Sequence, residues 1–291
     1  MKGLAIGGGD VPAHTGLALD GGGVLGIGPA WLLALYGHRF DSYSGTSVGG
    51  ILAAMLAFHD PKDAYALFAP RIAKIFHPVP LWWKVDPTRP KWQNDGLAAC
   101  AKEIFGSLKM SDSPVPLFIC ASDFATGSVK VYDRSDSDLV ADVVVRSASA
   151  PTYFEPLNSR WADGGIVANN PSMVHIAGLQ SKEHIPFADQ RILSLATGGT
   201  YWKDPKIGAR MAALQWASPV IHFAMQASLQ FAAFQAAEVL GDRYLRIDPS
   251  VNYDVAMDDL SSVESWRKLW QNLWVAKGQA IQQFVNPVQG A

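Results

Sequence analysis

Short apolar runs alternate with segments of helical periodicity along most of the chain. The short runs are bounded by glycine, proline or polar residues, a pattern typical of buried strands. They cover residues 16–19, 40–43, 115–122, 129–132 and 191–196. Helices are expected at residues 29–36, about 50–58, 63–76, 97–105, 139–147 and from Pro171 onward. Strands separated by helices predict an α/β fold with a mainly parallel central sheet covered on both faces.

Two stretches depart from this alternation. Residues 77–93 interleave four prolines with three tryptophans, which predicts an irregular aromatic loop. The C-terminal part is mostly helical in pattern, and Trp266, Trp270 and Trp274 share one apolar helix face that we expect in the core. Because no repeat and no Gly/Ser-rich linker interrupts the sequence, we expect a single domain over residues 1–291. Its motif-bearing core spans about 16–200, and its helical C-terminal part spans about 205–291.

Composition narrows the class of protein. Hydrophobic residues make up 49% of the chain and charged residues 17%, which excludes wholesale disorder. The net charge of -2 provides no basic field for nucleic acid, so we expect no nucleic-acid partner. Cys100 and Cys120 lie in apolar stretches and are expected as buried free thiols in a reducing compartment. Since no secretory apolar run occurs near residue 1, we expect a cytoplasmic protein.

The longest charge-free stretch, residues 211–237, has the length of a membrane span. Glutamines, a histidine and a proline recur along it, and such polar groups are costly in hydrocarbon, so we expect no transmembrane helix. A core helix is the plain interpretation of this stretch. The alternative is a helix that caps an acyl channel with Phe223, Met225, Leu229, Phe231 and Phe234.

The first candidate site is the glycine-rich turn at residues 20–26 (DGGGVLG), between an expected strand and a helix. Its glycines leave backbone N–H groups uncovered, and the following helix N-terminus favours negative charge. The spacing Gly21-x-Gly23-x-x-Gly26, with Asp41 further along, also fits a dinucleotide-binding fingerprint. A purely structural turn is the third interpretation.

The second candidate is the pentapeptide at residues 45–49 (GTSVG), between a strand and an apolar helix. This is the context of a nucleophile elbow, in which Gly45 and Gly49 allow a turn tight enough to project the Ser47 hydroxyl. The helix behind it stabilises a developing oxyanion. The expected backbone donors to that oxyanion are the amides of Gly22, Gly23 and Val48. Taken alone, an ordinary turn is the alternative.

The third candidate is the base that a serine nucleophile needs. The chain has seven histidines, and none lies in a glycine-flanked turn at a strand end. Asp163 does, within residues 161–165, and a partly buried carboxylate can take the proton directly. The alternatives are an Asx turn at Asp163, and an α/β-hydrolase triad in which His175 or His222 follows Ser47 and Asp163 along the chain.

In their order along the chain, these three stretches resemble the motifs of the patatin-like phospholipase family. Further stretches agree with the family pattern, at residues 121–127 (ASDFATG), 147–156 (SASAPTYFEP), 169–171 (NNP) and 194–198 (SLATG). The resemblance covers residues 16–199, about two-thirds of the chain. Several ordered motifs together are highly specific, whereas each one alone is not.

The resemblance implies a three-layer α/β/α sandwich and a Ser-Asp dyad without histidine. Ser47 matches the nucleophile and Asp163 the base, and the oxyanion hole matches the loop of Gly21, Gly22 and Gly23. The implied reaction is hydrolysis of fatty-acyl esters in membrane phospholipids, without a metal or another cofactor. It also implies peripheral contact with membranes, and it leaves a homo-oligomer open.

One position departs from the family. Members usually carry Arg or Lys in the glycine loop where this chain has Leu25, so the side chain there cannot favour an anionic head group. Outside the motifs, Trp82, Trp83 and Lys84 have the composition of an interfacial anchor. Tryptophans packed against the core are the alternative.

Two other classes of function remain open at this level. An acyltransferase can use a similar elbow, with an acceptor alcohol or thiol in place of water. A non-catalytic nucleotide-binding module can be built on Gly21, Gly23 and Gly26, although it leaves Ser47 and Asp163 unexplained.

Overall fold

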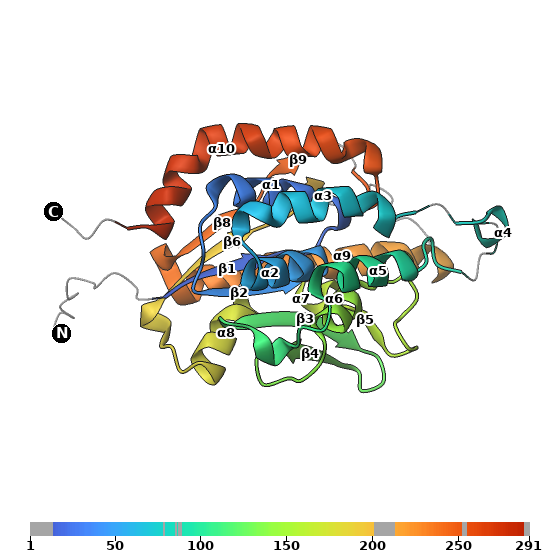
Figure 1. Ribbon diagram of the computed structural model, residues 1–291, viewed down its shortest axis with the longest axis horizontal. Coiled ribbons are helices and arrows are strands. Elements are labelled where there is room, and N and C mark those ends of the chain that lie inside the picture. Colours follow the sequence, from blue (N-terminus) through green and yellow to red (C-terminus); the bar gives the residue numbers. More distant parts are fainter. Residues whose placement is uncertain are drawn as a thin grey trace.

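The computed structural model describes residues 14–77, 79–84, 86, 89–200, 213–251 and 255–287. Within these residues, a seven-stranded sheet lies at the centre of the molecule, with strand order β4-β3-β2-β1-β6-β8 and β5 paired to β3 off this path (Figure 1). The strands are β1 (His14–Leu19), β2 (Ser42–Thr46), β3 (Leu117–Asp123), β4 (Ser128–Tyr132), β5 (Trp161–Asp163), β6 (Gln190–Leu195) and β8 (Tyr244–Ile247). The short β7 (Gly199–Thr200) and β9 (Ser250–Val251) pair with each other.

The sheet is mainly parallel. Strands β3, β2, β1, β6 and β8 run in one direction, whereas β4 and β5 pair with β3 in the antiparallel sense. β1 is buried from its third residue onward, as expected for a strand covered on both faces. The apolar run that begins at Gly16 therefore forms the middle of the sheet, and the carboxyl ends of its parallel strands meet along one edge.

Helices cover both faces of the sheet (Figure 1). One layer consists of α1 (Ile27–Tyr36), α2 (Val48–Phe58), α3 (Ala64–Ile75), α5 (Asp95–Phe105), α6 (Val140–Ala148) and α10 (Val263–Val285). The other consists of α7 (Gly165–Ala168), α8 (Ser172–Lys182) and α9 (Ala213–Leu240). The single turn α4 (Leu81–Lys84) lies apart from both layers. The fold is thus a three-layer α/β/α sandwich, as predicted.

Local chemistry explains where several helices begin and end. α1 ends at Gly37, which adopts φ 62° and donates its amide to the Leu33 carbonyl, as the sequence predicts for a C-terminal glycine. α2 is buried on all sides from Val48 to Ala57, so its apolar residues need no polar face. Trp270 of α10 packs so closely on α1 that a Cβ at Gly28 would collide with its indole.

Several other sequence expectations can be compared with the structure. Trp266 and Trp270 are buried in the core, as expected, while Trp274 is partly buried. Cys100 and Cys120 are buried free thiols, and burial raises the pKa of Cys120 to about 12. None of the helices in the described part of the chain is long and apolar enough to cross a bilayer.

The C-terminal part, expected to be mostly helical, also contains a strand that was not predicted, β8. The chain returns to the sheet at Tyr244–Ile247 and pairs in parallel with β6. Arg246 made this strand hard to predict from the sequence. A buried strand with an arginine is stable only if a partner neutralises the charge, and the sequence does not identify that partner. β8 and α10 attach the C-terminal part to the sheet and to α1; the single-domain interpretation stays a prediction.

Candidate active site

Three strand ends meet at the point where the order of the sheet reverses. β1 pairs in parallel with β2 on one side and with β6 on the other. In open α/β sheets, the crevice outside the carboxyl ends of the strands at such a point is the usual place for a ligand. The glycine-rich loop follows β1, Ser47 follows β2, and Thr197 follows β6. The motifs found in the sequence therefore lie together in space.

Ser47 lies on a sharp turn from β2 into α2. Its backbone has φ 57° and ψ -127°, a strained conformation for a residue with a side chain, as in a nucleophile elbow. A Cβ on Gly45 would collide with the Gly49 carbonyl, and one on Gly49 would collide with the Leu19 carbonyl. Both flanking positions thus require glycine, and the turn places Ser47 at the N-terminus of α2.

A second serine holds the backbone of this turn. The Ser47 amide donates a 2.9 Å hydrogen bond to the Ser147 hydroxyl, which is fully buried at the end of α6. Ser147 opens the SASAP stretch that carries part of the family resemblance. No role for Ser147 itself was predicted, because residues 47 and 147 become neighbours only in the folded chain.

Asp163 ends β5, which pairs with β3 so that Asp163 lies opposite Ala121. The side chain is 1% exposed, and its Oδ1 accepts a 2.6 Å hydrogen bond from the Gly165 amide. Burial raises the pKa of Asp163 to about 6, and the hydrogen bonds from Ser47 and from the Gly165 amide oppose this rise. The carboxyl group is therefore ionised, yet a much stronger base than an exposed aspartate, near neutral pH.

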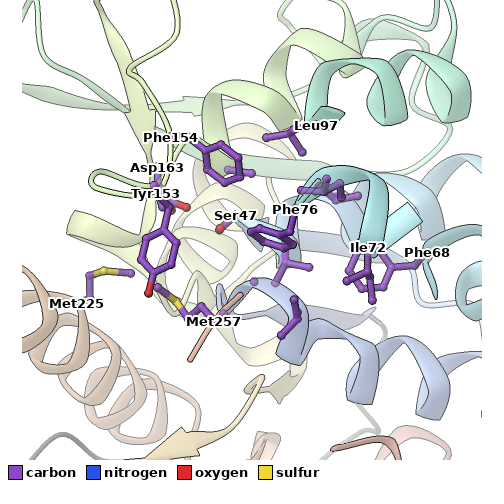
Figure 2. A pocket seen from close by; sticks show the side chains of 18 residues that line it. Ser47, Phe68, Ile72, Phe76, Leu97, Tyr153, Phe154, Asp163, Met225 and Met257 are labelled. Carbon is purple, nitrogen blue, oxygen red and sulfur yellow. The ribbon is translucent and has the colours of Figure 1, made fainter. Parts of the chain in front are cut away.

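The structure brings Ser47 and Asp163 together. Ser47 and Asp163 line the same pocket, and the Ser47 hydroxyl is near enough to the Asp163 carboxyl group to oppose the rise of its pKa (Figure 2). A carboxylate in this place is a candidate acceptor for the hydroxyl proton, which general-base activation of a serine requires.

His175 does not complete a triad. Its Nε2 shares a 2.7 Å hydrogen bond with Ser42 and its Nδ1 a 3.0 Å hydrogen bond with Ser44, both on β2. Burial lowers the pKa of His175 to about 3, so the ring is neutral and serves the packing of α8 on the sheet. The side chain of His222, the other histidine considered, lies outside the described residues.

The glycine-rich loop is fixed from several sides. The Gly21 amide donates to the Asn169 carbonyl at 3.1 Å, and the Val24 amide donates to the Met257 carbonyl at 2.7 Å. The Thr197 hydroxyl donates to the Gly21 carbonyl at 2.7 Å and leaves no room for a Cβ on Gly22. The amide of Gly21 is thus committed to Asn169, contrary to its expected part in an oxyanion hole.

The other three residues of the expected oxyanion hole lie at the pocket. Gly22, Gly23 and Val48 line the pocket together with Ser47 and Asp163. Gly23 has φ 58°, a conformation that favours glycine, and a Cβ there would collide with the Met257 carbonyl. The conformation of the loop therefore depends on its glycines and on the residues that contact them.

Arg246 anchors the start of this loop. Its guanidinium binds the carboxylate of Asp20 through both nitrogens, at 2.6 and 3.3 Å, and also Ser194 at 2.8 Å. Burial raises the pKa of Asp20 to about 6, and the nearby guanidinium opposes this rise and keeps the pair ionised at neutral pH. Leu25, at the position where the resemblance leads one to expect a cation, is 3% exposed and packs in the core. The cation beside the loop in this chain therefore comes from β8.

The pocket that opens at Ser47 is apolar. It contains about 600 Å³ of space not filled by atoms, part of it open to solvent. Ser47, Tyr153 and Asp163 supply the polar side chains of its lining. The apolar wall is formed by α3, α5 and neighbouring segments, with side chains that include Phe68, Ile72, Phe76, Leu97 and Phe154 (Figure 2).

Residues 211–237 were expected to form either a core helix or a helix that caps an acyl channel, and α9 has features of both. Met225 lines the pocket, as a capping helix requires, although Met211 and Ala212 lie outside the described residues. Phe223, Phe231 and Phe234 are 60–61% exposed, so this is not a plain core helix.

In the aromatic loop, Trp83 is buried and donates its Nε1–H to the Pro90 carbonyl, whereas Trp82 is 59% exposed.

The dinucleotide interpretation does not fit the geometry. Asp41 accepts hydrogen bonds from the amide and hydroxyl of Thr15, at the amino end of β1, whereas the glycine-rich loop follows its carboxyl end. Gly26 serves packing, because a Cβ there would meet a Val48 methyl group at 2.5 Å. The three spaced glycines therefore belong to the loop and to its contact with α2.

Comparison with known proteins gives a consistent match. The family model described as "Patatin-like phospholipase" matches residues 17–174, more than half of the chain. This range contains the glycine-rich loop, the elbow at Ser47 and the turn at Asp163. It stops short of Thr197, Arg246 and α9.

Three curated relatives illustrate the range of the similarity. "Patatin-like protein 2" of Arabidopsis thaliana is 28% identical over 86% of this chain and 79% of its own length. A "cGAMP-activated phospholipase" of Pseudomonas aeruginosa is 28% identical over 85% of this chain and 82% of its own length. "Probable inactive patatin-3-Kuras 1" of Solanum tuberosum is 25% identical over 71% of this chain and 69% of its own length. Since one relative is named inactive, similarity alone does not decide whether the site reacts.

Proposed function

The chain belongs to the patatin-like phospholipase family, and we propose that it is a lipid acyl hydrolase of the phospholipase A type that uses Ser47 and Asp163 as a catalytic dyad. The observation that carries this proposal is the placement of Ser47 and the buried carboxyl group of Asp163 in the lining of one apolar pocket, beside a glycine-rich loop. The Gly165 amide donates to Asp163 Oδ1, as in an Asx turn, but such a turn does not explain the strained backbone of Ser47 beside it. The reaction accounts for both residues.

In the first half of the reaction, Asp163 takes the hydroxyl proton as the Ser47 oxygen attacks the ester carbonyl of a phospholipid. The negative charge that develops on the carbonyl oxygen is held by the amides of Gly22, Gly23 and Val48 and by the N-terminus of α2. Protonated Asp163 then gives its proton to the departing alcohol, and an acyl-serine remains. The leaving product is a lysophospholipid.

In the second half, water attacks the acyl-serine. Asp163, now ionised again, takes a proton from the water and returns it to the Ser47 oxygen as the acyl bond breaks. The fatty acid leaves, and the dyad is restored. A histidine is unnecessary, since the raised pKa of Asp163 lets a carboxylate do both proton transfers near neutral pH. No step of this scheme requires a metal.

The lining of the pocket supports an acyl chain as the part of the substrate that it binds. Phe68 and Ile72 of α3 and Leu97 of α5 extend the apolar wall away from Ser47, on the side opposite Tyr153 and Met225 (Figure 2). Transfer of methylene groups from water to such a surface is favourable by about 0.8 kcal/mol each. A fatty-acyl chain therefore fits this lining better than a polar or charged acyl group.

Peripheral contact with a membrane is part of the proposal. Val220, Phe223, Phe231 and Phe234 recur at helical spacing along α9 and are 51–61% exposed, and between Val220 and Phe234 the helix carries no charged residue. Single exposed apolar side chains are ordinary, but a contiguous stripe indicates an interaction surface. The same helix carries Met225 into the pocket wall. A cytoplasmic enzyme that takes its substrate from a bilayer accounts for this arrangement, and Trp82 is a second candidate contact.

The proposal is tested by fatty-acid release from phosphatidylcholine and phosphatidylglycerol vesicles, followed by mass spectrometry. We expect Ser47→Ala and Asp163→Asn to lower the rate at least about 1000-fold without unfolding the protein. His175→Gln and His222→Gln are the matched controls, because the dyad tolerates both. Full activity in either dyad variant excludes this mechanism, and loss of activity in a folded His222→Gln protein supports the triad. An increase of turnover on adding an acceptor alcohol indicates an acyltransferase.

A further inference from the structure

Asn169 lies between the glycine-rich loop and the turn that carries Asp163. It follows α7, and its backbone carbonyl accepts the amide of Gly21 at 3.1 Å. The preceding carbonyl, of Ala168, accepts a 2.6 Å hydrogen bond from the hydroxyl of Thr46, the residue before Ser47. The backbone at residues 168–169 thus contacts the loop and the nucleophile strand at once.

The side-chain carbonyl of Asn169 has an unusual environment. Its Oδ1 is buried and has no hydrogen-bond partner among the described residues. A Cβ on Gly21 would collide with this oxygen, and a Cβ on Gly165 would approach it to 2.9 Å. Both glycines therefore present a Cα hydrogen to it, which suits a carbonyl oxygen and not an NH₂ group. The oxygen is fixed between the loop and the base turn.

This oxygen and the carboxyl group of Asp163 both border the Cα of Gly165. The Oδ1 atoms of Asn169 and Asp163 each lie 2.9 Å from the same point, the position of a Cβ on Gly165. A carbonyl oxygen without a donor carries a negative partial charge, and such a charge disfavours a neighbouring carboxylate. The other titratable groups nearby, Cys120 of β3 and Tyr153 of the pocket, have pKa values raised by burial and stay neutral.

We propose that Asn169 is a positioning residue for the reaction at Ser47. Its side-chain carbonyl spaces the glycine-rich loop from the Asp163 turn, and as a carbonyl oxygen without a donor on the same side of Gly165 as the carboxylate it makes Asp163 a stronger proton acceptor. An unsatisfied buried carbonyl costs stability, and such costs concentrate at functional sites. This inference rests on the proposed function for its catalytic meaning, but its physical content can be measured without turnover.

The adjacent Asn170 provides a matched control. Its Oδ1 accepts hydrogen bonds from the Ser172 amide at 2.9 Å and from the Ser172 hydroxyl at 2.6 Å, so its side chain stabilises the start of α8. The two asparagines are neighbours in sequence and equal in chemistry. Asn170 has the ordinary structural role that Asn169 lacks.

The direct test is the pKa of Asp163, measured by NMR in protein labelled with ¹³C at the aspartate carboxyl groups and assigned by the signal lost in Asp163→Asn. We expect Asn169→Leu, which keeps the size and removes the carbonyl, to lower the pKa by about half a unit or more. Asn169→Asp should raise it above the wild-type value. Asn170→Ala should leave it unchanged and lower the melting temperature, whereas Asn169→Leu should melt no earlier than wild type.

Kinetics supply the second readout. For a positioning residue, Asn169→Leu should lower kcat about tenfold with little change in KM, and the acid limb of the pH profile should move with the pKa of Asp163. A pKa that stays fixed or rises in Asn169→Leu overturns the inference, even if the enzyme is active. An inactive wild-type enzyme in which the pKa still moves as expected contradicts the proposed function and leaves the role of Asn169 in the base environment standing.

Discussion

At the scale of single residues, the burial of Asp163 has the clearest chemical consequence in the site. A carboxyl group that is 1% exposed and has no charged partner among the described residues loses most of its hydration. Desolvation of this kind disfavours the ionised form and raises the pKa, here to about 6 from an ordinary value of 3.8. Burial therefore brings the pKa of the base close to neutral pH, and the rate of the reaction should change with pH around this pKa.

We expect kcat/KM to fall about tenfold per pH unit below a midpoint near 6. The sign follows from the role of the group: Asp163 accepts a proton only when ionised, so activity is present above its pKa and is lost as the pH falls through it. The measurement is a pH–rate profile on a soluble short-chain ester, with folding checked by circular dichroism at each pH. Activity that stays constant down to pH about 4.5 contradicts the assignment.

Asp20 provides the control for this profile, because burial raises its pKa to about 6 as well. Its carboxylate is bound by Arg246 and holds the loop, so it does not exchange protons with Ser47. In Asp20→Asn the maximal rate should change while the acid midpoint remains. If the acid midpoint of the pH–rate profile disappears in Asp20→Asn, then Asp20 in the loop, and not Asp163, causes the pH dependence.

Some residues of the site were predictable from the sequence and others were not. Ser47 and Asp163 were found because glycines beside them record a tight backbone turn, which is a local property. Ser147, Thr197 and Arg246 act through contacts with residues 100 or more positions away, namely Ser47, Gly21 and Asp20. The residues that flank each of these positions in the sequence do not indicate such long-range contacts. The hydrogen bond of the Gly21 amide to Asn169 is a further contact of this kind.

At the scale of elements, β8 decides how the glycine-rich loop is held. This strand is the edge of the parallel sheet, and its Arg246 reaches across β6 to Asp20 at the end of β1. β8 was not predictable from the sequence, since four residues with a central arginine show no strand pattern. The partner that makes the arginine tolerable lies 226 positions away.

We predict that Arg246→Met destabilises the protein by about 3 kcal/mol, because it leaves a buried carboxylate without its partner. The matched control is Lys74→Met, whose ion pair with Glu103 is largely exposed and should be worth less than about 1 kcal/mol. The measurement is urea unfolding at pH 8, where an unpaired Asp20 is ionised. Equal losses in the two variants contradict this account, and Asp20→Asn combined with Arg246→Met should recover part of the stability.

At the scale of the whole molecule, the active site and the exposed stripe of α9 share one helix. The sheet and its inner helices were predictable because the alternation of apolar runs records burial on both faces. The exposure of the α9 phenylalanines was not, because an apolar helix has the same sequence pattern whether it faces a core or a membrane. Only the packing of α9 on α7 and α8 decides which of its faces remains open.

We predict that Phe231→Ser combined with Phe234→Ser weakens binding to phospholipid vesicles roughly 10- to 100-fold, because each side chain contributes about 1–2 kcal/mol of apolar transfer. Val275→Ser on α10 is the control, since this residue is 83% exposed in the opposite helix layer. The measurement is co-sedimentation with vesicles, alongside hydrolysis of a soluble ester that should stay unchanged. Equal binding by the stripe variant and wild type, or a change from dimer to monomer in its place, contradicts the membrane assignment.

The central claim is that Ser47 is a nucleophile activated by Asp163. The most direct measurement is labelling with a fluorophosphonate, with the modified residue located by peptide mass spectrometry. We predict a single adduct on Ser47 in the wild-type protein, none in Ser47→Ala, and a labelling rate at least about 100-fold lower in Asp163→Asn at pH 7.5. An adduct on another serine, or the same labelling rate with and without the Asp163 carboxylate, would contradict the account.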